Sequence, residues 1–420
     1  MATTFSTTYN TQEALQKPLI VTLTSTNTAE EKFRYILQVY VNTVLVATIK
    51  QQANSADDAN FDVWRILETY KGIRFESSSG VQMHGYNLAL ASDGEVNYIQ
   101  LKAGEEYAAS ATENTTEYLA QATETFAVLN GVWQFTEGLS PSLDDYVYHD
   151  NTDTLKFLTK SPSTVRARLE DEGMIAFWNG DLDSPVTALG ALTLGIRFFD
   201  RTNTQTGATV TKALIADLSA EAVVADDIEG NYTYLATYLP FYPANIEAIT
   251  GVTIPLDASY YTYQITSNNV TPVEWELKTV QLYEDCKYSS IRLAWQNDLS
   301  TWDYFNFELL SENSINIDRK SLVKPYGNWD STSFTYGYDE RGKAIYDISA
   351  ENEYTVNSNW LTDDEFTWLR GLLMSKEVQF YNGSVWIPVV ITDSSYTIKK
   401  KVNGKLNNLQ LKFQTAHKLR

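Results

Sequence analysis

The chain has 420 residues, of which 43% are hydrophobic and 20% charged, so it is long enough for several packed cores and its composition argues against global disorder. Its formal net charge is −21. Nucleic acids and anionic membranes both attract clustered Lys and Arg, so we expect neither as a partner. The one dense basic cluster, Lys399 to Lys401 with Lys405, resembles the edge of a hairpin more than a groove.

Aromatic residues make up 13% of the chain, and its many Tyr, Trp and Thr favour half-buried strands. The single cysteine, Cys286, excludes an intramolecular disulfide, and its strand-like surroundings favour a small buried side chain over a reactive thiol. The N-terminus lacks the basic and then apolar segments of a signal peptide, and the most apolar stretch, 186–199, is too short to span a bilayer. We therefore expect a mainly β protein that folds in the cytoplasm.

Residues 1–135 are predicted to form an N-terminal β-sandwich domain. Between Phe33 and Val41 every second residue is apolar, which indicates a strand with one buried face. Asn42 and Thr43 fit a tight turn, and 44–50 fits the returning strand. Helical spacing of apolar residues predicts a short helix within 61–70, and further strands are expected at 95–107 and 125–135.

Residues 136–311 are predicted to form a central β-sandwich domain with long loops. A polar, proline-punctuated connector comes first, and about seven short strands with frequent turn signals follow it, which is typical of a sandwich. The pattern of 221–251 leaves open whether this segment is an elaborated loop or a small insertion.

Residues 312–420 are predicted to form a C-terminal β domain that carries one amphipathic helix, over about 363–374. Thr362 and Glu365 have the spacing of a capping box, and two aspartates follow in the first turn, where the helix dipole favours anions. Four strands are expected after the helix, with turns at Asn382-Gly383 and Asn403-Gly404. The predicted fold class is therefore mainly β, with a multi-domain β-sandwich architecture.

A search for catalytic chemistry finds little. The three histidines lie in different sections of the chain: His84, His149 and His417. None has the spacing of a zinc site, and the sequence holds neither a GxSxG motif nor a P-loop. Asn179, Asp181 and Asp183 alternate as in a calcium loop, but the glycine and distal glutamate of an EF-hand are missing, which favours a surface turn. We predict no catalytic residue, no cofactor and no metal.

The aromatic stretch 291–311 permits two interpretations, a sugar-binding groove or two strands joined by a polar turn. Ile291, Leu293 and Trp295 alternate, as they do on the buried face of a strand, and a second alternating segment follows the turn. The two-strand interpretation explains nearly every aromatic residue and is favoured. Trp302, at the edge of the turn, is the aromatic residue that the pattern does not bury, so it is the candidate interface residue.

Several segments together resemble large virion structural proteins of tailed bacteriophages, especially phages of Bacteroidetes-type hosts. They are KFRYILQVYVN, VLVATIK, NFDVWRIL, GEEY, VLNGVWQF, CKYSSIRLAWQNDLSTWDYFNF, RKSLVKPYGNW and VWIPVVITDSSYTIKKKVNGKLNNLQLKFQTA. The last of these is also similar to the end of tail and baseplate proteins, where PVVITDSSY precedes a final hairpin. The resemblance lies in structural segments and carries no active-site residue.

The resemblance implies a tail or baseplate component of the virion that acts through contacts with other virion proteins and with copies of itself. One alternative is a carbohydrate-binding adhesin or tail-fibre part that recognises a host-surface glycan, and a second is a polysaccharide-degrading enzyme. Assembly predicts long apolar strips that another chain covers. An adhesin predicts a few coplanar rings in a wet groove, and an enzyme requires two buried, facing carboxylates.

Overall fold

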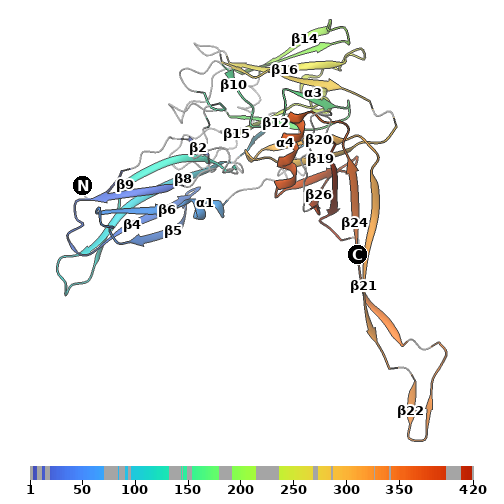
Figure 1. Cartoon of the computed structure of the whole chain (residues 1–420). Coiled ribbons are helices and arrows are strands. Elements are labelled where there is room, and N and C mark those ends of the chain that lie inside the picture. The colour runs from blue at the N-terminus through green and yellow to red at the C-terminus, as the bar shows by residue number, and fades with distance from the viewer. Residues whose placement is uncertain are drawn as a thin grey trace, which may run out of the picture. The chain divides into compact units, whose positions relative to one another are not determined.

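The computed structural model consists mainly of strands, which confirms the predicted fold class (Figure 1). The chain divides into two compact units. The first unit contains Met1–Glu284 and Gln296–Asp303, and the second contains Asp285–Trp295 and Tyr304–Arg420. The structure describes residues 3–6, 12–14, 19–70, 84, 90–92, 96–131, 143, 145–148, 154–178, 192–213, 236–267, 273–284, 287–325, 327–339, 342–393 and 408–418.

The N-terminal part of the first unit contains two antiparallel sheets and a short helix. The three-stranded sheet has the order β1-β3-β6, with bounds Thr3–Phe5, Ile20–Ser25 and Asp58–Asp62. The five-stranded sheet has the order β2-β9-β8-β4-β5, with bounds Gln12–Ala14, Thr116–Leu129, Val96–Ala108, Glu31–Val41 and Val44–Gln51. Helix α1 spans Trp64–Glu68, inside the segment where a short helix was predicted.

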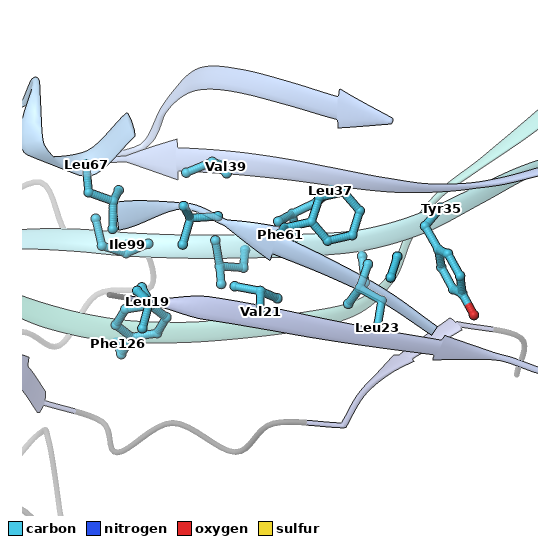
Figure 2. Close-up of a cluster of buried hydrophobic side chains, with 14 of the residues drawn as sticks. Leu19, Val21, Leu23, Tyr35, Leu37, Val39, Phe61, Leu67, Ile99 and Phe126 are labelled. Carbon is cyan, nitrogen blue, oxygen red and sulfur yellow. The ribbon is translucent and has the colours of Figure 1, made fainter. Parts of the chain in front are cut away.

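The inner faces of these two sheets form one hydrophobic core (Figure 2). Strand β4 contributes its alternating residues to this core, as predicted, and Val21 and Phe61 face them from the other sheet. The turn after β4 is also confirmed, because Asn42 and Thr43 both have positive φ, at 46° and 71°. The Asn42 side chain stabilises this turn by accepting a hydrogen bond from the Tyr98 backbone N–H at 2.9 Å.

The rest of the first unit holds a second pair of sheets. The three-stranded sheet has the order β12-β15-β7, with bounds Met174–Trp178, Ala236–Pro240 and Leu90–Ser92. The seven-stranded sheet runs β10 (Thr154–Leu155), β17 (Glu274–Trp275), β16 (Tyr260–Ser267), β13 (Leu192–Phe199) and β14 (Gln205–Ala213), and β18 (Lys278–Leu282) joins β16 to β11 (Thr164–Ala167). Phe177 and Trp275 pack edge to face between these sheets, with ring centroids 5.3 Å apart.

Two segments differ from the expected organisation of this region. Strand β7 lies within the range expected for the N-terminal domain, but it pairs with β15. Residues 236–250, which the sequence left open between a loop and an insertion, contain strand β15 and helix α3 (Pro243–Thr250). Both features depend on pairing between distant segments, which local periodicity does not specify.

The second unit is built on a seven-stranded sheet with the order β20-β19-β25-β26-β27-β24-β21. In that order the strands span Trp302–Phe307, Ile291–Gln296, Val378–Tyr381, Trp386–Ile391, Gln410–Thr415, Lys343–Asn357 and Glu312–Val323. Helix α4 spans Asp363–Met374 as predicted. The Thr362 Oγ1 accepts the Glu365 backbone N–H at 3.2 Å and the Glu365 side chain accepts the Thr362 N–H at 2.8 Å, which confirms the capping box.

Strands β19 and β20 correct one expectation. We expected this pair in the central sandwich, but β19 pairs with β25 and therefore belongs to the C-terminal sheet. Trp295 is buried, as predicted, and its ring lies 5.0 Å from that of Trp368 on helix α4. The buried face of β19 was therefore predicted correctly, but the sheet to which this strand belongs was not.

Candidate interaction surface

Trp302, the candidate interface residue from the sequence, is only 3% exposed. Its ring packs edge to face on His84, with centroids 4.7 Å apart. The turn before it is buried because it hydrogen-bonds elsewhere in the first unit: Asn297 Nδ2 donates to the Leu158 carbonyl at 3.1 Å. The expectation that Trp302 lies outside the core was wrong, and without an exposed face this residue does not anchor an interface.

The other residues singled out in the sequence form no site among the described residues. His84 is buried beside Trp302 and His417 is exposed. Within the described ranges, no group of three or more His, Cys, Asp or Glu side chains is placed to hold a metal ion. The remaining candidates lie outside the described residues: Cys286, His149, Asn179, Asp181, Asp183, the turn at Asn403-Gly404 and the basic cluster Lys399 to Lys401 with Lys405.

Glu105 is a buried carboxyl group with a structural role. Burial alone would raise its pKa, but hydrogen bonds from Ser25, Thr3 and Asn27 outweigh that effect and lower it. The Ser25 and Thr3 hydroxyls donate at 2.6 Å and 2.8 Å, and Asn27 Nδ2 donates at 2.8 Å. A carboxylate held ionised in this way ties three segments of the sandwich together and is poorly suited to act as a general acid.

A two-stranded ribbon in the second unit is the most exposed part of the described structure. Strands β21 and β24 pair in antiparallel fashion along their length, but β27 accompanies β24 only from Glu353 to Asn357. Among the described residues, 315–323 and 343–352 therefore pair only with each other. We call residues 315–352 the arm; Figure 1 shows it in orange, extending past the other strands of its sheet. At the strand repeat, 315–323 spans roughly 30 Å.

The register divides the arm into two faces of different character, because residues directly opposite each other on paired strands share a face. Ile317 lies opposite Ala350, Arg319 opposite Ile348, and Val323 opposite Lys343. The alternate residues place Asp318 opposite Ser349 and Lys320 opposite Asp347. One face, which we call the apolar face, thus contains Ile315, Ile317, Arg319, Ser321, Val323, Lys343, Ile345, Ile348, Ala350 and Asn352.

A one-residue bulge keeps the apolar face continuous. The register shifts between Lys320 and Ser321, so that Tyr346 on β24 has no directly opposite residue. Without the extra residue, Ile345 and Ile348 would point to opposite faces, because side chains alternate along a strand. The bulge therefore aligns the apolar residues on both sides of it.

Nothing in the described structure covers the apolar face. The exposed fractions are 57% for Ile315, 41% for Ile317, 82% for Val323 and 54% for Ile345. In an antiparallel sheet with one wet face, such residues normally lie on the core side. Here they form a long exposed apolar strip.

The charges on the two faces also differ. The apolar face carries Arg319 and Lys343 and no acidic residue. On the opposite face, Lys320 Nζ lies 2.9 Å from Asp347 Oδ2. That hydrogen-bonded pair raises the pKa of Lys320 and lowers the pKa of Asp347. The opposite face also carries Asp318 and Glu351, so its net charge is negative, whereas the apolar face has a net positive charge.

The tip of the arm is a second small hairpin, of β22 (Asn328–Asp330) and β23 (Ser333–Thr335). The backbone N–H groups of Thr332 and Ser333 donate to Asp330 Oδ1 and lower the pKa of its carboxyl group. Aromatic residues surround this turn, with Trp329 directly opposite Phe334. Trp329 is 70% exposed and Tyr338 fully exposed, so the tip also presents aromatic surface.

Sequence reasoning missed the arm, although one signal was present. Ile315 and Ile317 alternate with polar residues, which is the pattern of a strand with one apolar face. No strand was predicted for residues 312–323, which form β21. What the alternation does not reveal is that the apolar face remains uncovered.

No protein-family model matches the chain, and a comparison with curated proteins finds no similar sequence. None of the helices in the described part of the chain has the length and apolar character needed to cross a bilayer.

Proposed function

We propose that this protein is a structural component of a tailed-bacteriophage virion, in the tail or baseplate, and that it acts through protein–protein contacts in an oligomeric assembly. The exposed apolar face of the arm is the observation that carries this proposal. The resemblance of several sequence segments to phage virion proteins supports a virion as the assembly to which the chain belongs. The partners are other virion proteins and further copies of the chain.

The physical argument rests on the stability of the ribbon. A two-stranded hairpin without a third strand or a core is marginally stable in water. Burial of a Val or Ile side chain contributes about 1.5–3 kcal/mol, so covering the four exposed members of the apolar face would contribute several kcal/mol. A ribbon of this kind gains most from a partner chain, as an assembly component does.

The experiment is to find the chain in purified particles. Quantitative mass spectrometry should detect it in fixed proportion to the other virion proteins, and electron cryomicroscopy should place it in the tail or baseplate. Its absence from intact particles, despite expression during infection, would contradict the proposal.

The aromatic tip of the arm supports a second candidate function, a host-surface adhesin. Sugars stack on exposed aromatic rings, and Trp329, Tyr336 and Tyr338 are all exposed at the tip. Binding to a glycan array that Trp329→Ala abolishes would favour this function. Trp360→Ala is the matched control, because Trp360 is a 59% exposed tryptophan of the same unit outside the arm.

We also propose that the protein is not an enzyme. Burial raises the pKa of the Glu377 carboxyl group, as a general acid requires, so Glu377→Gln is the substitution that tests the enzymatic alternative. Purified protein should not degrade host polysaccharides or peptidoglycan. Reproducible turnover that Glu377→Gln or another carboxylate-to-amide change removes would contradict this proposal.

A further inference from the structure

We infer that the apolar face of the arm docks onto a second copy of this chain, against its acidic first unit. This inference rests on the proposed assembly function and names the contact by which copies join. It follows from what the face exposes, what charge it carries, and where the complementary charge lies.

The face has the composition of a buried surface. Ile315, Ile317, Val323 and Ile345 are each more than two-fifths exposed, along one side of a ribbon roughly 30 Å long. Contiguous exposed apolar surface of this kind marks an interaction site in a soluble protein. Every acidic residue of the two paired strands lies on the other side, so the two sides of the ribbon differ in both charge and apolar content.

The charge on the face excludes the simplest symmetric arrangement. If two arms packed with their apolar faces together, the interface would contain Arg319 and Lys343 from each copy. No acidic residue lies on that face to compensate them. Like charges brought together out of water are strongly unfavourable, so the cover of this face must be acidic.

The chain itself supplies an acidic partner surface. The first unit contains 38 acidic and 16 basic residues, a net charge of −22, whereas the second unit contains 15 acidic and 16 basic residues, a net charge of +1. Two copies that met through their first units would repel each other. Contact between the arm of one copy and the first unit of another brings opposite charges together and also steers the encounter.

Such a contact joins different surfaces of the two copies. Two copies that exchange arms reciprocally form a two-fold dimer, whereas copies joined head to tail form a closed ring or a filament. An anionic membrane or a nucleic acid could also attract an apolar and basic ribbon, but the net charge of −21 on the whole chain opposes both.

The first experiment measures self-association of the full chain by sedimentation velocity, with a matched pair of charge reversals. Arg319→Glu and Lys320→Glu change adjacent residues by the same charge, but Arg319 lies on the apolar face and Lys320 on the opposite face. We expect the wild type to form oligomers that weaken as salt rises. Arg319→Glu should weaken association by about tenfold or more, equivalent to about 1.4 kcal/mol, and Lys320→Glu should have a much smaller effect.

The second experiment identifies the partner surface. A photo-crosslinking amino acid replaces Ile345 on the apolar face, and isotopically light and heavy chains are mixed so that crosslinks between copies are recognised by mass. We expect crosslinks between copies that join position 345 to peptides of the first unit.

Four results would overturn the inference. Two come from sedimentation: a wild type that stays monomeric at its highest soluble concentration, or equal effects of the two charge reversals. The others are crosslinks only between two arms, and arm-dependent binding to anionic vesicles or DNA in place of self-association. These results are distinguishable from failure of the proposed function. A chain found in virions whose copies do not join through the arm contradicts this inference and leaves the virion role standing, whereas a self-associating chain absent from virions contradicts the proposed function.

Discussion

Strands β4 and β21 follow the same sequence rule and reach opposite outcomes. Both are long, both pair with a long antiparallel neighbour, and both carry apolar residues at alternate positions. The apolar face of β4 packs against β3 and β6 and becomes the core in Figure 2, whereas that of β21 remains exposed. Alternation therefore shows which face needs a cover, but not whether the same chain provides it.

The largest expected effect concerns the covered core of the second unit. Trp295 is fully buried, and its indole N–H has no hydrogen-bond partner among the residues that the structure describes, so it stabilises the core by packing. Trp295→Ala should lower the free energy of unfolding by about 3–5 kcal/mol, and Trp295→Phe should cost less. Denaturant unfolding measures both. Trp329→Ala, at an exposed position, is the control and should change the free energy of unfolding by no more than about 0.5 kcal/mol. An equal loss of stability for Trp329→Ala would show that covered and uncovered tryptophans do not differ in their contribution.

The comparison of the two strands can be tested directly with one substitution on each. Leu37 is fully buried on β4 and Ile317 is exposed on β21. Leu37→Ala should cost about 2–5 kcal/mol, whereas Ile317→Ala should change the stability of the monomer by no more than about 0.5 kcal/mol. Thermal and denaturant unfolding at low protein concentration provide the measurement. A large loss for Ile317→Ala in the monomer would show that the arm is covered within its own chain.

A third prediction concerns the polar anchor of the first sandwich. Glu105→Gln should destabilise the first unit by about 1–3 kcal/mol, because an amide cannot accept all the hydrogen bonds that the carboxylate accepts. The pKa of Glu105 is lowered from its ordinary value of 4.5 in the folded state. Its contribution is therefore present above pH 4.5 and lost as the pH falls through the lower folded-state value.

Unfolding measured between neutral and acidic pH should accordingly show a smaller difference between wild type and Glu105→Gln at low pH. Glu117→Gln offers a control, since Glu117 is an exposed carboxylate of the same sheet. A difference that grows on acidification would mean that the folded protein protonates Glu105 readily.

The smallest effect is expected at the cap of helix α4. Thr362→Ala removes one half of the capping box and should cost about 0.5–2 kcal/mol, with Thr362→Ser as the conservative control. The measurement requires the whole chain, because β19 and β20 belong to the same sheet as residues 312–420. Unchanged unfolding of Thr362→Ala would show that the helix begins without help from its cap.

Features set by neighbouring residues could be predicted from the sequence. The buried face of β4, the turn at Asn42 and Thr43, and the helix with its Thr362 cap each depend on residues a few positions apart. The burial of Trp295 follows from the same alternation. In these cases local periodicity and turn chemistry agree with the final fold, so the local sequence is sufficient to predict the structure.

The features that could not be predicted depend on distant parts of the chain. Trp302 is buried because His84 and the turn at Asn297 pack around it. Strand β19 belongs to the C-terminal sheet because it pairs with β25, which follows much later in the chain. The alternation at Ile315 and Ile317 was enough to predict an apolar face on the arm. It was not enough to predict that this face is exposed, because exposure depends on which other segments lie beside it.

The chain passes between its two units more than once, and this affects the order in which they can be completed during synthesis. The second unit starts at Asp285, is left at Trp295 and is resumed at Tyr304. The buried turn at Asn297 and the bond from Thr159 to Asp303 belong to the first unit. The nascent chain therefore cannot finish its first unit until Asp303 has left the ribosome, by which time β19 has emerged without its partner β25. Translation products that end just before this point contain every residue of the core in Figure 2, but they lack the partner strand of β19 and the bond from Thr159 to Asp303, so we expect chaperones to bind them through the later segments.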